Sequence, residues 1–482
     1  MSPHPPVSSF ASWVQFQART NPHALAVTAG NRNVNYRGFA EHIERVTRRL
    51  AAKSIEAGAR VSVTVDDEYL HWLVVMALSR IGAVSVSVSR GVDAHGFVKA
   101  AFIVTDGARI KGPKNVAIDA GWYTQAADDL PAFEEAPHDW DAPCRIVLSS
   151  GTTGAARKIL LTYGDLRLRF ISTGRTYGLN ATARILTTMG VGSIGGFITP
   201  ARTWAGGGCV ILSAGPEENF TRLFLRNHPN VILASTVQLA TLVKALPADY
   251  WPIEQAIVYV SGSALPVSVN RRTRARLSQA LFVVYGSTEA GTVATAHAAG
   301  AEGKPGFTGF VLPTAQLQVV DDARKPVPAG TPGEIRVSAE GGATRYLDDD
   351  AASAETFRDG WFYPGDLGML DGEGQLFVFG RKSEVINFGG VKLSPQLLED
   401  TLANFPGVAD IAVFAHEPKG GMSRPGIAVV AGKEFDEKGL KERFARMHKL
   451  PEPAILRVKD IPRNEMGKVL RNELAQAAAK LA

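Results

Sequence analysis

The chain has 482 residues, and at about 150 residues per domain this length predicts roughly three modules, or one large subdivided domain with a lid. Hydrophobic residues make up 45% and charged residues 21%, which are close to globular averages and favour neither disorder nor a membrane protein as the general class. The formal net charge of +5 is small for this length. It is only weak evidence for a polyanionic partner, and no nucleic acid is expected.

Cysteine use and the absence of membrane signals predict a cytoplasmic protein. The two cysteines, Cys144 and Cys209, lie in apolar stretches without a partner at metal-ligand spacing. Residues 1–10 lack the basic start and apolar core of a secretory signal. The most membrane-like stretch, Trp72–Val88, is interrupted by an arginine and a glycine, and predicts a buried helix that leads into a strand rather than a membrane span.

Short β-branched runs alternate with helical stretches and predict an α/β fold. The first cycle is VSVTV at Val61–Val65, an apolar helix, and AVSVSVS at Ala83–Ser89. A second sheet is predicted from the strands Arg184–Thr188, Cys209–Leu212, Val231–Leu233, Ile257–Val260 and Leu281–Val284. The basic run Asn270–Leu277 is interpreted as the solvated face of a helix.

The pattern changes after Gly291. Turn residues punctuate alternating apolar residues at Gln316–Ser338, which predicts a small β subdomain. A compact α/β pattern then returns, with a charged amphipathic helix at about Glu434–His448 and an Ala-rich helix at the end. About one hundred residues suffice for a separate small domain.

A glycine- and hydroxyl-rich run, SSGTTGAARKILLT, occupies Ser149–Thr162, directly after a predicted strand at Ile146–Leu148. Such a loop can present backbone N–H groups and hydroxyls to β- and γ-phosphates, although no Walker loop occurs in the chain. A surface turn is the alternative, and the two cations that follow make it less favoured. The candidate phosphate-binding residues are Ser150, Gly151, Thr152, Thr153, Gly154, Arg157 and Lys158.

A second segment, YGSTEAG at Tyr285–Gly291, follows a predicted buried strand. Tyr285 is a candidate to stack on a purine, and Glu289 is a candidate Mg²⁺ ligand, because Mg²⁺ prefers carboxylate and phosphate oxygens. Taken alone, a strand-end turn with a capping glutamate explains the segment equally well. Its occurrence together with the hydroxyl-rich run favours a nucleoside triphosphate site.

Five segments in order make the chain resemble the adenylate-forming superfamily, which includes acyl-CoA synthetases, carrier-protein-loading adenylation domains and beetle luciferases. They are SSGTTGAARK, YGSTEAG, WFYPGDLG at Trp361–Gly368, GRKSEVINFGGVKLSP at Gly380–Pro395, and PRNEMGKVLR at Pro462–Arg471. The resemblance covers nearly the whole chain. It implies an N-terminal domain of two α/β sheet subdomains and a small β subdomain, residues 1–381, and a small mobile α+β lid domain, residues 382–482.

The resemblance also implies roles for individual residues. Asp366 matches the aspartate that binds both ribose hydroxyls, and Arg381 matches an arginine that contacts the nucleotide. Lys468 matches the lysine that offsets the repulsion between carboxylate and α-phosphate. The remaining ATP- or AMP-binding candidates are Gly262, Ser263, Ala264, Tyr285, Gly286 and Ser287, and Thr288 and Glu289 join Lys468 as catalytic candidates.

Rotation of the lid domain between two half-reactions is a further implication of the resemblance. Gly389 and Gly390 match paired glycines along the pantetheine path, where side chains obstruct passage. Lys382 and Ser383 stand at the hinge, where the family usually has Asp or Lys at the second position. Another departure is Ala156-Arg157 in place of the usual Pro-Lys, with Lys158 following.

The acid pocket is predicted in MGVGSIGGF, Met189–Phe197. This segment has no aspartate to pair with a substrate ammonium, so a non-amino acid is expected. Its glycines are interpreted as leaving room for an aryl or medium-to-long apolar acid. The candidate pocket residues are Val191, Gly192, Ile194, Gly195 and Phe197.

The resulting prediction is an enzyme that uses ATP and Mg²⁺ to convert a small carboxylic acid to its acyl-adenylate, releases pyrophosphate, and transfers the acyl group to CoA. One alternative is transfer to the phosphopantetheine arm of an acyl carrier protein, which would be a separate protein. A non-catalytic nucleotide sensor and a light-emitting oxidase remain as alternatives of other classes.

Overall fold

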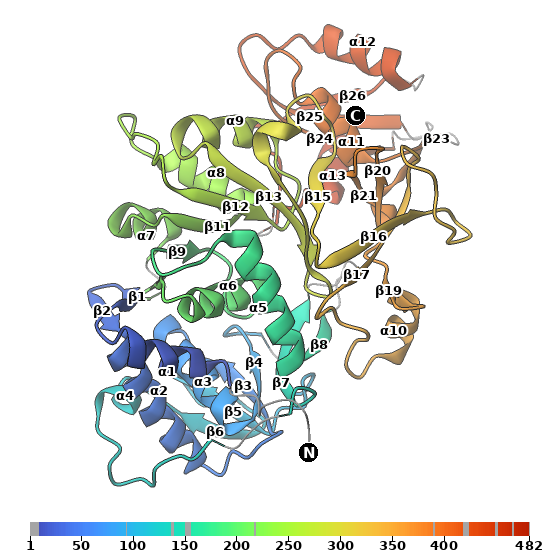
Figure 1. Cartoon of the computed structure of the whole chain (residues 1–482). Helices are drawn as coiled ribbons and strands as arrows, with labels where there is room; N and C mark the ends of the chain where they lie inside the picture. Colours follow the sequence, from blue (N-terminus) through green and yellow to red (C-terminus); the bar gives the residue numbers. More distant parts are fainter. Residues whose placement is uncertain are drawn as a thin grey trace. The chain divides into compact units, whose positions relative to one another are not determined.

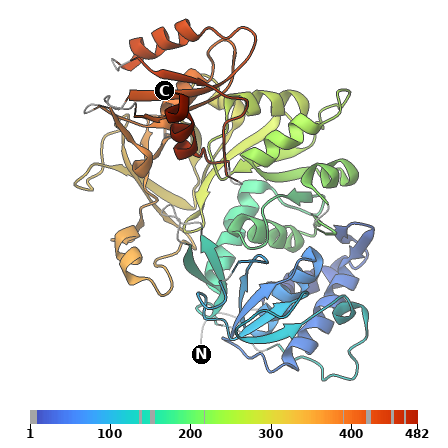
Figure 2. The same cartoon turned by 180° about the vertical axis from the view of Figure 1, so that it is seen from behind.

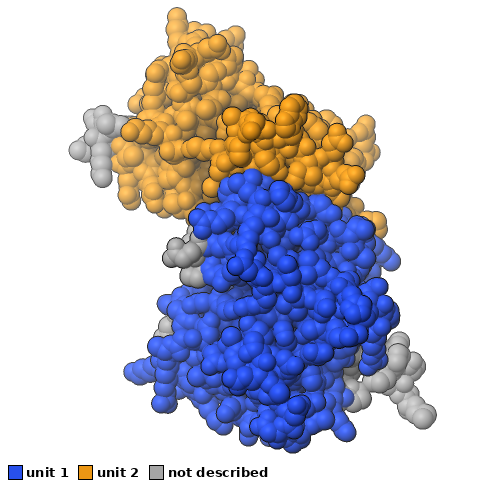
Figure 3. All heavy atoms as spheres, turned by 90° about the vertical axis from the view of Figure 1, so that its left-hand side faces the viewer, with its two compact units in different colours: residues 1–233, 288–291, 339–360 blue, residues 234–287, 292–338, 361–482 orange. Residues whose placement is uncertain are grey.

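The computed structural model describes residues 9–92, 94–135, 139–149, 156–215, 218–388, 391–417, 424–448, 452–464 and 467–481 (Figure 1). The chain divides into two compact units, which Figure 3 colours separately. Unit 1 comprises residues 1–233, 288–291 and 339–360, and unit 2 comprises residues 234–287, 292–338 and 361–482. Among the helices described, none is long and apolar enough to cross a membrane.

Unit 1 contains a six-stranded sheet in the order β6-β5-β3-β4-β7-β8. Its strands are β3 (Arg60–Thr64), β4 (Val84–Ser87), β5 (Phe102–Thr105), β6 (Lys114–Ala117), β7 (Pro143–Ser149) and β8 (Arg157–Thr162). All neighbours pair in parallel except β7 and β8, which are antiparallel. The strands predicted at Val61–Val65 and Ala83–Ser89 are therefore present, in parallel register as expected for α/β architecture.

The apolar stretch after β3 forms the buried helix α3 (Glu68–Ile81), as predicted. The Asp67 side chain accepts a hydrogen bond from the backbone N–H of Leu70 at its start, and Gly82 ends it with a φ of 81°. Residues 69–81 are all buried, which explains why this helix is apolar on every side. Helices α1 (Ala11–Thr20) and α2 (Tyr36–Ala51) lie beside it (Figure 1).

A second set of strands in unit 1 follows the order β11-β9-β10-β1-β2. They are β1 (Leu25–Ala29), β2 (Arg32–Asn35), β9 (Arg184–Thr187), β10 (Cys209–Leu212) and β11 (Val231–Ser235). All pair in parallel except β2, which forms an antiparallel hairpin with β1. The other helices are α4 (Gly121–Thr124), α5 (Tyr163–Tyr177), α6 (Ile194–Ala205), α7 (Phe220–Asn227) and α10 (Asp350–Thr356), and β18 (Phe357–Arg358) follows α10.

Aromatic side chains from several helices of unit 1 meet in its core. The Trp72 ring stacks on Phe197 with ring centroids 5.6 Å apart and meets Trp204 edge-on at 4.9 Å. Trp204 also packs against Phe39 at 5.0 Å. These four residues lie on α2, α3 and α6, so a single aromatic cluster fixes the three helices against one another.

Unit 2 contains two parallel strands, β12 (Ile257–Ser261) and β13 (Ala280–Ser287). Helices α8 (Thr236–Ala245) and α9 (Val267–Arg276) flank β12 in the sequence, and the exposed Arg271 and Arg272 confirm that the basic run lies on the solvated face of a helix. The sheet continues through β14 (Gly291–His297), β15 (Phe307–Val311), β21 (Gln375–Arg381), β20 (Asp366–Leu370), β17 (Gly333–Ala339) and β19 (Trp361–Phe362), while β16 (Ala315–Val320) pairs with β17. The short 3₁₀ helices are η1 (Ala298–Ala301) and η2 (Lys382–Glu384).

The last hundred residues of unit 2 have an α+β composition, as predicted. A three-stranded sheet in the order β24-β25-β26 is built from β24 (Val408–His416), β25 (Arg424–Ala431) and β26 (Ala454–Arg457). The remaining elements are the hairpin β22 (Ile386–Phe388) and β23 (Val391–Leu393), and the helices α11 (Pro395–Leu402), α12 (Glu437–His448) and α13 (Arg471–Leu481). Figure 2 shows α13 against this sheet, with Leu474 and Ala478 buried beside Ala412 and Phe414.

Helix α12 begins at Glu437, three residues later than predicted, because residues 432–435 form a turn in which the Phe435 N–H bonds to the Gly432 carbonyl. The domain boundary after Arg381 stays a prediction.

A buried histidine makes the stability of unit 1 sensitive to pH. His71 on α3 is 5% exposed, and its Nδ1 and Nε2 atoms lie 3.0 Å from the Val65 carbonyl oxygen and 2.8 Å from the Ser87 hydroxyl. Burial lowers the pKa of His71 from 6.5 to about 4. The unfolded chain therefore binds a proton between these two pH values that the folded chain does not, and stability falls as the pH drops through this window.

We predict that the wild-type protein loses up to about 3 kcal/mol of unfolding free energy through this group between pH 6.5 and 4. His71→Gln should be less stable at pH 7.5 and should show a shallower decline on acidification. Urea denaturation across this pH range measures both effects. His228→Asn, at an exposed position with a left-handed φ of 46° that Asn tolerates, is the control and should keep the wild-type decline. Equal slopes for His71→Gln and wild type would contradict the assignment.

Candidate functional site

Two of the predicted nucleotide-binding segments lie at the carboxyl ends of adjacent parallel strands. Strand β12 leads into Gly262–Ala264, and β13 contains Tyr285–Ser287 at its end. The carboxyl ends of parallel neighbours meet at one edge of a sheet, where ligands bind in α/β folds. Gly262 turns with a φ of 99°, and the Ser263 hydroxyl lies 2.6 Å from that of Thr236 at the start of α8.

A buried carboxylate lies beside these segments in unit 2. Asp366 is 5% exposed, its Oδ2 accepts a 2.6 Å hydrogen bond from the Tyr285 hydroxyl, and its Oδ1 lies 3.0 Å from Nε of Arg381. Asp366 and Arg381 are register partners in the antiparallel pair β20–β21, which brings their side chains together. The structure thus brings three predicted nucleotide-binding residues into direct contact.

The charge state of this cluster follows from its surroundings. Burial raises the pKa of Asp366, while the positive charges of Arg381 and Lys468 and the hydrogen bond from Tyr285 lower it. Burial and the neighbouring carboxylate hold the pKa of the Tyr285 hydroxyl well above its usual value, so Tyr285 remains a hydrogen-bond donor. The cluster offers a carboxylate that is oriented before any ligand arrives.

The Lys468 loop lies against the same part of unit 2. A bridge between Arg463 and Val469 closes it, and the Lys468 N–H donates to Oδ1 of Asn464 at 3.0 Å. A Cβ atom at Gly467 would come within 2.3 Å of the Thr236 hydroxyl oxygen and 2.8 Å of that of Ser263. The loop is therefore seated on the predicted adenine segment, with the Lys468 charge close enough to lower the pKa of Asp366.

The predicted hinge follows directly on Arg381. The Lys382 backbone N–H bonds to the Gly365 carbonyl at 2.8 Å, and its ammonium pairs with Glu334 at 2.8 Å. Ser383 is exposed within η2. These two contacts anchor Lys382, and the hinge role of Lys382 and Ser383 stays a prediction.

Glu289 in unit 1 is 8% exposed and belongs to a second polar cluster. The Tyr346 hydroxyl donates to its Oε1 at 3.1 Å and accepts from Nη1 of Arg157 at 3.2 Å, while the Arg157 guanidinium lies 4.8 Å from the centroid of the Tyr346 ring. Burial raises the pKa of Tyr346 to about 12, which keeps it a donor at neutral pH. The structure thus links Glu289, the predicted magnesium ligand, to Arg157 of the hydroxyl-rich run.

The sequence patterns did not predict that Tyr346 and Arg169 belong to this region. Tyr346 occurs in a turn-rich stretch without a motif, and Arg169 lies within a helical pattern in which an arginine is expected on the surface. Instead, Arg169 is 4% exposed and its guanidinium donates to the carbonyls of Gly341, Thr288 and Glu289 at 2.7 to 2.9 Å. It fixes the main chain on which both catalytic candidates stand.

Lys158 takes a direction different from that of Arg157. Its ammonium is buried, donates to the Phe97 carbonyl at 2.9 Å and pairs with Asp348 at 2.9 Å. Successive side chains on β8 point to opposite faces of the sheet, so only one of these two cations can face Glu289. Within unit 1, the structure places Arg157 there.

The predicted acid-pocket segment forms a loop and the first turn of α6. Val191 is 9% exposed, Gly192 and Ile194 are partly exposed, and Phe197 is fully buried against Trp72 and Phe10. The interpretation that the glycines leave room for the acid is wrong for Gly195 and Gly196. A Cβ atom at Gly195 would lie 2.8 Å from the sulfur of Met189, and one at Gly196 would lie 2.2 Å from the carbonyl oxygens of Met189 and Gly190. These glycines allow the loop to close on the helix.

The predicted phosphate loop Ser150, Gly151, Thr152, Thr153 and Gly154 and the paired Gly389 and Gly390 lie outside the described residues.

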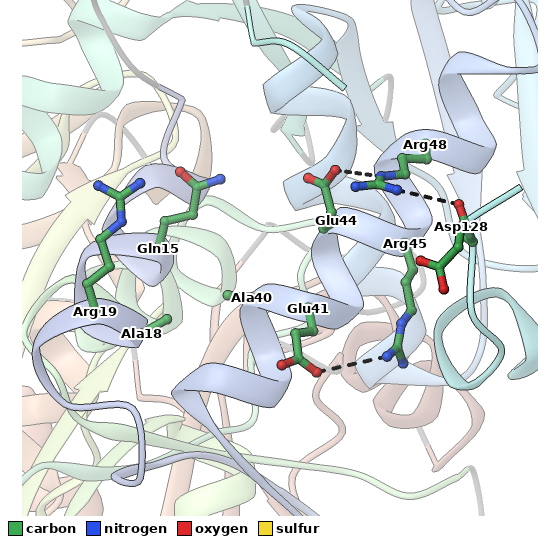
Figure 4. Close-up of a pocket in the computed structure, with 10 residues that line it drawn as sticks. Gln15, Ala18, Arg19, Ala40, Glu41, Glu44, Arg45, Arg48 and Asp128 are labelled. Carbon is green, nitrogen blue, oxygen red and sulfur yellow. Dashed lines mark hydrogen bonds and ion pairs between the residues drawn. The ribbon is translucent and has the colours of Figure 1, made fainter. Parts of the chain in front are cut away.

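A surface cavity of about 440 Å³ on unit 1 contains none of the predicted site residues. It lies beside α1 and α2, and charged side chains such as Arg19, Glu41, Glu44 and Arg48 line it (Figure 4). Figure 4 shows Glu44 turned toward Arg48, 2.7 Å away, and Glu41 turned toward Arg45, 3.9 Å away, while Arg19 lies apart from both pairs. Because both of these glutamates are already paired with arginines, this cavity is not assigned a ligand.

Comparison with known proteins decides the family. The sequence matches the family described as AMP-binding enzyme over residues 14–347, more than half of the chain. The chain belongs to the AMP-binding enzyme family. This confirms the resemblance inferred from the five segments.

Several known proteins are similar to this chain over nearly its full length. An indoleacetate–CoA ligase of Aromatoleum aromaticum is 27% identical, with 98% of each chain covered. ATP-bound MatB from Rhodopseudomonas palustris has the same fold with a TM-score of 0.83, 21% identity and coverage of 98% of this chain and 99% of its own. The o-succinylbenzoate CoA synthetase MenE from Bacillus subtilis, in complex with ATP and magnesium ion, has a TM-score of 0.77, 22% identity and coverage of 96% and 98%.

The different directions of Arg157 and Lys158 predict different effects of their removal. Arg157→Met should weaken the binding of ATP with magnesium by about tenfold, because it deletes a charge beside Glu289 and Tyr346. Lys158→Met should leave that affinity within about twofold and should lower the unfolding free energy by on the order of 2 kcal/mol, through loss of a buried ion pair. Isothermal titration and urea denaturation measure the two quantities. The reverse pattern would show that Lys158 serves the nucleotide.

Proposed function

We propose that this AMP-binding enzyme is an acid–CoA ligase that activates a carboxylic acid with ATP, forms an acyl-adenylate with release of pyrophosphate, and transfers the acyl group to CoA. The observation that carries the proposal is the arrangement within unit 2, where Asp366, paired with Arg381 and Tyr285, lies near the Lys468 loop. A binding site for the nucleotide alone does not need a lysine held against it by a separate loop. The full-length similarity to CoA ligases supports the same activity.

The cluster around Asp366 is suited to the ribose of ATP. An ionised carboxylate only accepts hydrogen bonds, so it can receive both hydroxyls of a ribose. Arg381 keeps Asp366 in the charged form and Tyr285 fixes its direction. At the neighbouring strand end Gly262 and Ala264 are exposed, so a purine can lie along this segment.

Lys468 is suited to the adenylation step. The carboxylate oxygen of the acid forms a bond to the α-phosphorus, the bond from that phosphorus to pyrophosphate breaks, and two anions must approach each other. A compact ammonium offsets this repulsion and stabilises the charge that develops in the transition state. Such a group contributes roughly 3–4 kcal/mol, or a few hundredfold in rate.

Glu289 fits a magnesium ion bound together with phosphates. Among the described residues no group of three or more His, Cys, Asp or Glu side chains gathers as a metal cage, which agrees with Mg²⁺, an ion commonly held by one or two carboxylates and the substrate's phosphates. Tyr346 and Arg169 hold the Glu289 side chain and main chain in place. When bound, Mg²⁺ supplies positive charge that neutralises the phosphates.

The acid is proposed to be a non-amino acid with an aromatic or extended apolar body. The predicted pocket segment has no acidic side chain for a substrate ammonium, and its residues Val191 and Ile194 are apolar. The acids named for the similar ligases, indoleacetate and o-succinylbenzoate, each carry an aromatic ring and support this class.

A panel of aryl, arylalkanoic, fatty and amino acids tests the proposal. With ATP, Mg²⁺ and CoA, at least one non-amino acid should give stoichiometric AMP and acyl-CoA, detected by mass spectrometry. If AMP and a thioester form only when a phosphopantetheinylated carrier protein is added, the result would favour carrier loading. The absence of acid-dependent pyrophosphate exchange with every acid would refute catalysis and leave a nucleotide sensor.

The contact of the Lys468 loop with Thr236 and Ser263 predicts a variant that slows one half-reaction and not the other. Gly467→Ala should slow adenylation at least tenfold, because its Cβ collides with Thr236 and Ser263, and should largely spare thioester formation from pre-made acyl-adenylate. Lys468→Ala should show the same selectivity. Rapid-quench measurements of each half-reaction provide the test.

Gly374→Ala is the matched control for Gly467→Ala. Gly374 has a φ of 76°, close to the 87° of Gly467, but a Cβ atom there meets nothing within 4 Å. It carries comparable backbone strain, about 1 kcal/mol, without the collision. Equal loss of adenylation in both variants would show that the strain, and not the seat of the loop, matters.

A further inference from the structure

A buried guanidinium lies behind the predicted acid-pocket segment of unit 1. Arg145 occupies the middle of β7, is 0% exposed, and is the register partner of Ser85 on the parallel strand β4. An arginine within a buried parallel strand departs from the apolar pattern such strands follow. The contacts of the Arg145 side chain show why an arginine is placed there.

The guanidinium joins strand β4 to the loop that precedes α6. Its Nη1 donates to the Ser85 hydroxyl at 3.1 Å, and its Nη2 donates to the Ser87 hydroxyl at 2.9 Å and to the Val191 carbonyl at 2.6 Å. The side chain therefore bonds one residue of the pocket segment directly and holds it at a fixed distance from the sheet.

A second contact holds the other end of the same segment. The Arg145 guanidinium lies 4.3 Å from the ring centroid of Phe197, in the first turn of α6. Val191 and Phe197 thus contact one side chain, and Phe197 in turn stacks on Trp72. The loop and the start of the helix are positioned together.

A chain of hydrogen bonds fixes the direction of the guanidinium. The Val65 carbonyl can only accept, so Nδ1 of His71 carries the proton and Nε2 accepts from the Ser87 hydroxyl. The Ser87 oxygen is then free to accept from Arg145. His71, Ser87 and Arg145 form one relay that ends on the Val191 carbonyl.

Among the described residues no carboxylate acts on the charge of Arg145, and its Nε has no hydrogen-bond partner there. Burial lowers its pKa to about 10, which leaves it charged at neutral pH. A buried charge without a counter-charge destabilises a fold, and an apolar side chain of similar size is often more stable. Stability alone is therefore a poor reason for an arginine here.

We infer that Arg145 is a positioning residue that sets the acid specificity of this enzyme, by holding the Val191 carbonyl and the Phe197 ring in the arrangement that shapes the acid pocket. The inference rests on the proposed function, because the pocket assignment is part of it. Arg145 touches no reacting atom and acts through the Val191–Phe197 segment.

Arg145→Lys is the decisive variant. A lysine keeps the charge but lacks the planar fork that reaches two serines and a carbonyl at once. The KM for the acid should rise about tenfold or more, and the ranking of acids in the panel should change, while the KM values for ATP and CoA stay within about twofold. Hydrogen exchange of the amides in residues 189–197 should accelerate.

Arg49→Lys is the matched control. Arg49 also lies in unit 1 and its guanidinium also bonds main-chain carbonyls, those of Trp122 at 3.0 Å and Ala126 at 2.7 Å, in another loop. It should alter neither the acid KM nor exchange in residues 189–197. Arg145→Met removes the charge as well as the hydrogen bonds. The unfolding free energy of this variant shows whether a loss of acid affinity comes from displacement of the Val191–Phe197 segment or from a general loss of stability.

The outcomes separate the inference from the function on which it rests. If the wild-type enzyme activates no acid, the proposed function is refuted, and the specificity role of Arg145 with it. Hydrogen exchange in residues 189–197 then still decides whether Arg145 holds this segment in place. Active wild-type enzyme and an Arg145→Lys variant with unchanged acid KM, acid ranking and exchange would overturn the inference alone. A parallel rise of all three KM values would also overturn it.

Discussion

The parallel pairing of β12 and β13 is the constraint on which the nucleotide site depends. Parallel neighbours must end at the same edge of a sheet, and this brings Gly262–Ala264 beside Tyr285–Ser287 although about twenty residues separate them. The hydroxyl of Tyr285 then reaches Asp366, and the antiparallel register of β20 and β21 adds Arg381. Strand pairing and one side-chain hydrogen bond thus bring four segments from separate parts of the sequence together.

Two buried arginines of this protein hold main-chain carbonyls in place. Arg169 bonds the carbonyls of Thr288 and Glu289, and Arg145 bonds the carbonyl of Val191. A guanidinium suits this task because its five donors lie in one rigid plane and its charge survives burial. The two arginines lie behind different candidate sites, one behind the candidate magnesium ligand and the other behind the predicted acid-pocket segment.

The comparison of Arg157 with Lys158 shows how strand geometry assigns a role that composition leaves open. Both cations come after the glycines and hydroxyls of the hydroxyl-rich run, and either one supplies the positive charge expected beside the phosphates. On β8 their side chains point to opposite faces, so Lys158 pairs with Asp348 while Arg157 contacts Tyr346 beside Glu289. The family's usual lysine is thus replaced in position by an arginine, which brings a planar fork in place of a point charge.

The sequence by itself determined the family, the α/β class and the main elements, because these depend on local periodicity and on ordered motifs. Helix α3 and strand β4 follow directly from such patterns, and so do the positions of Asp366, Arg381 and Lys468 in their motifs. Only the tertiary structure decided which side chains meet. The burial of Arg169 inside a helical pattern, the bridge of Tyr346 between Arg157 and Glu289, and the closure of the loop on Gly196 each involve partners far apart in the chain, and local patterns carry no record of such contacts.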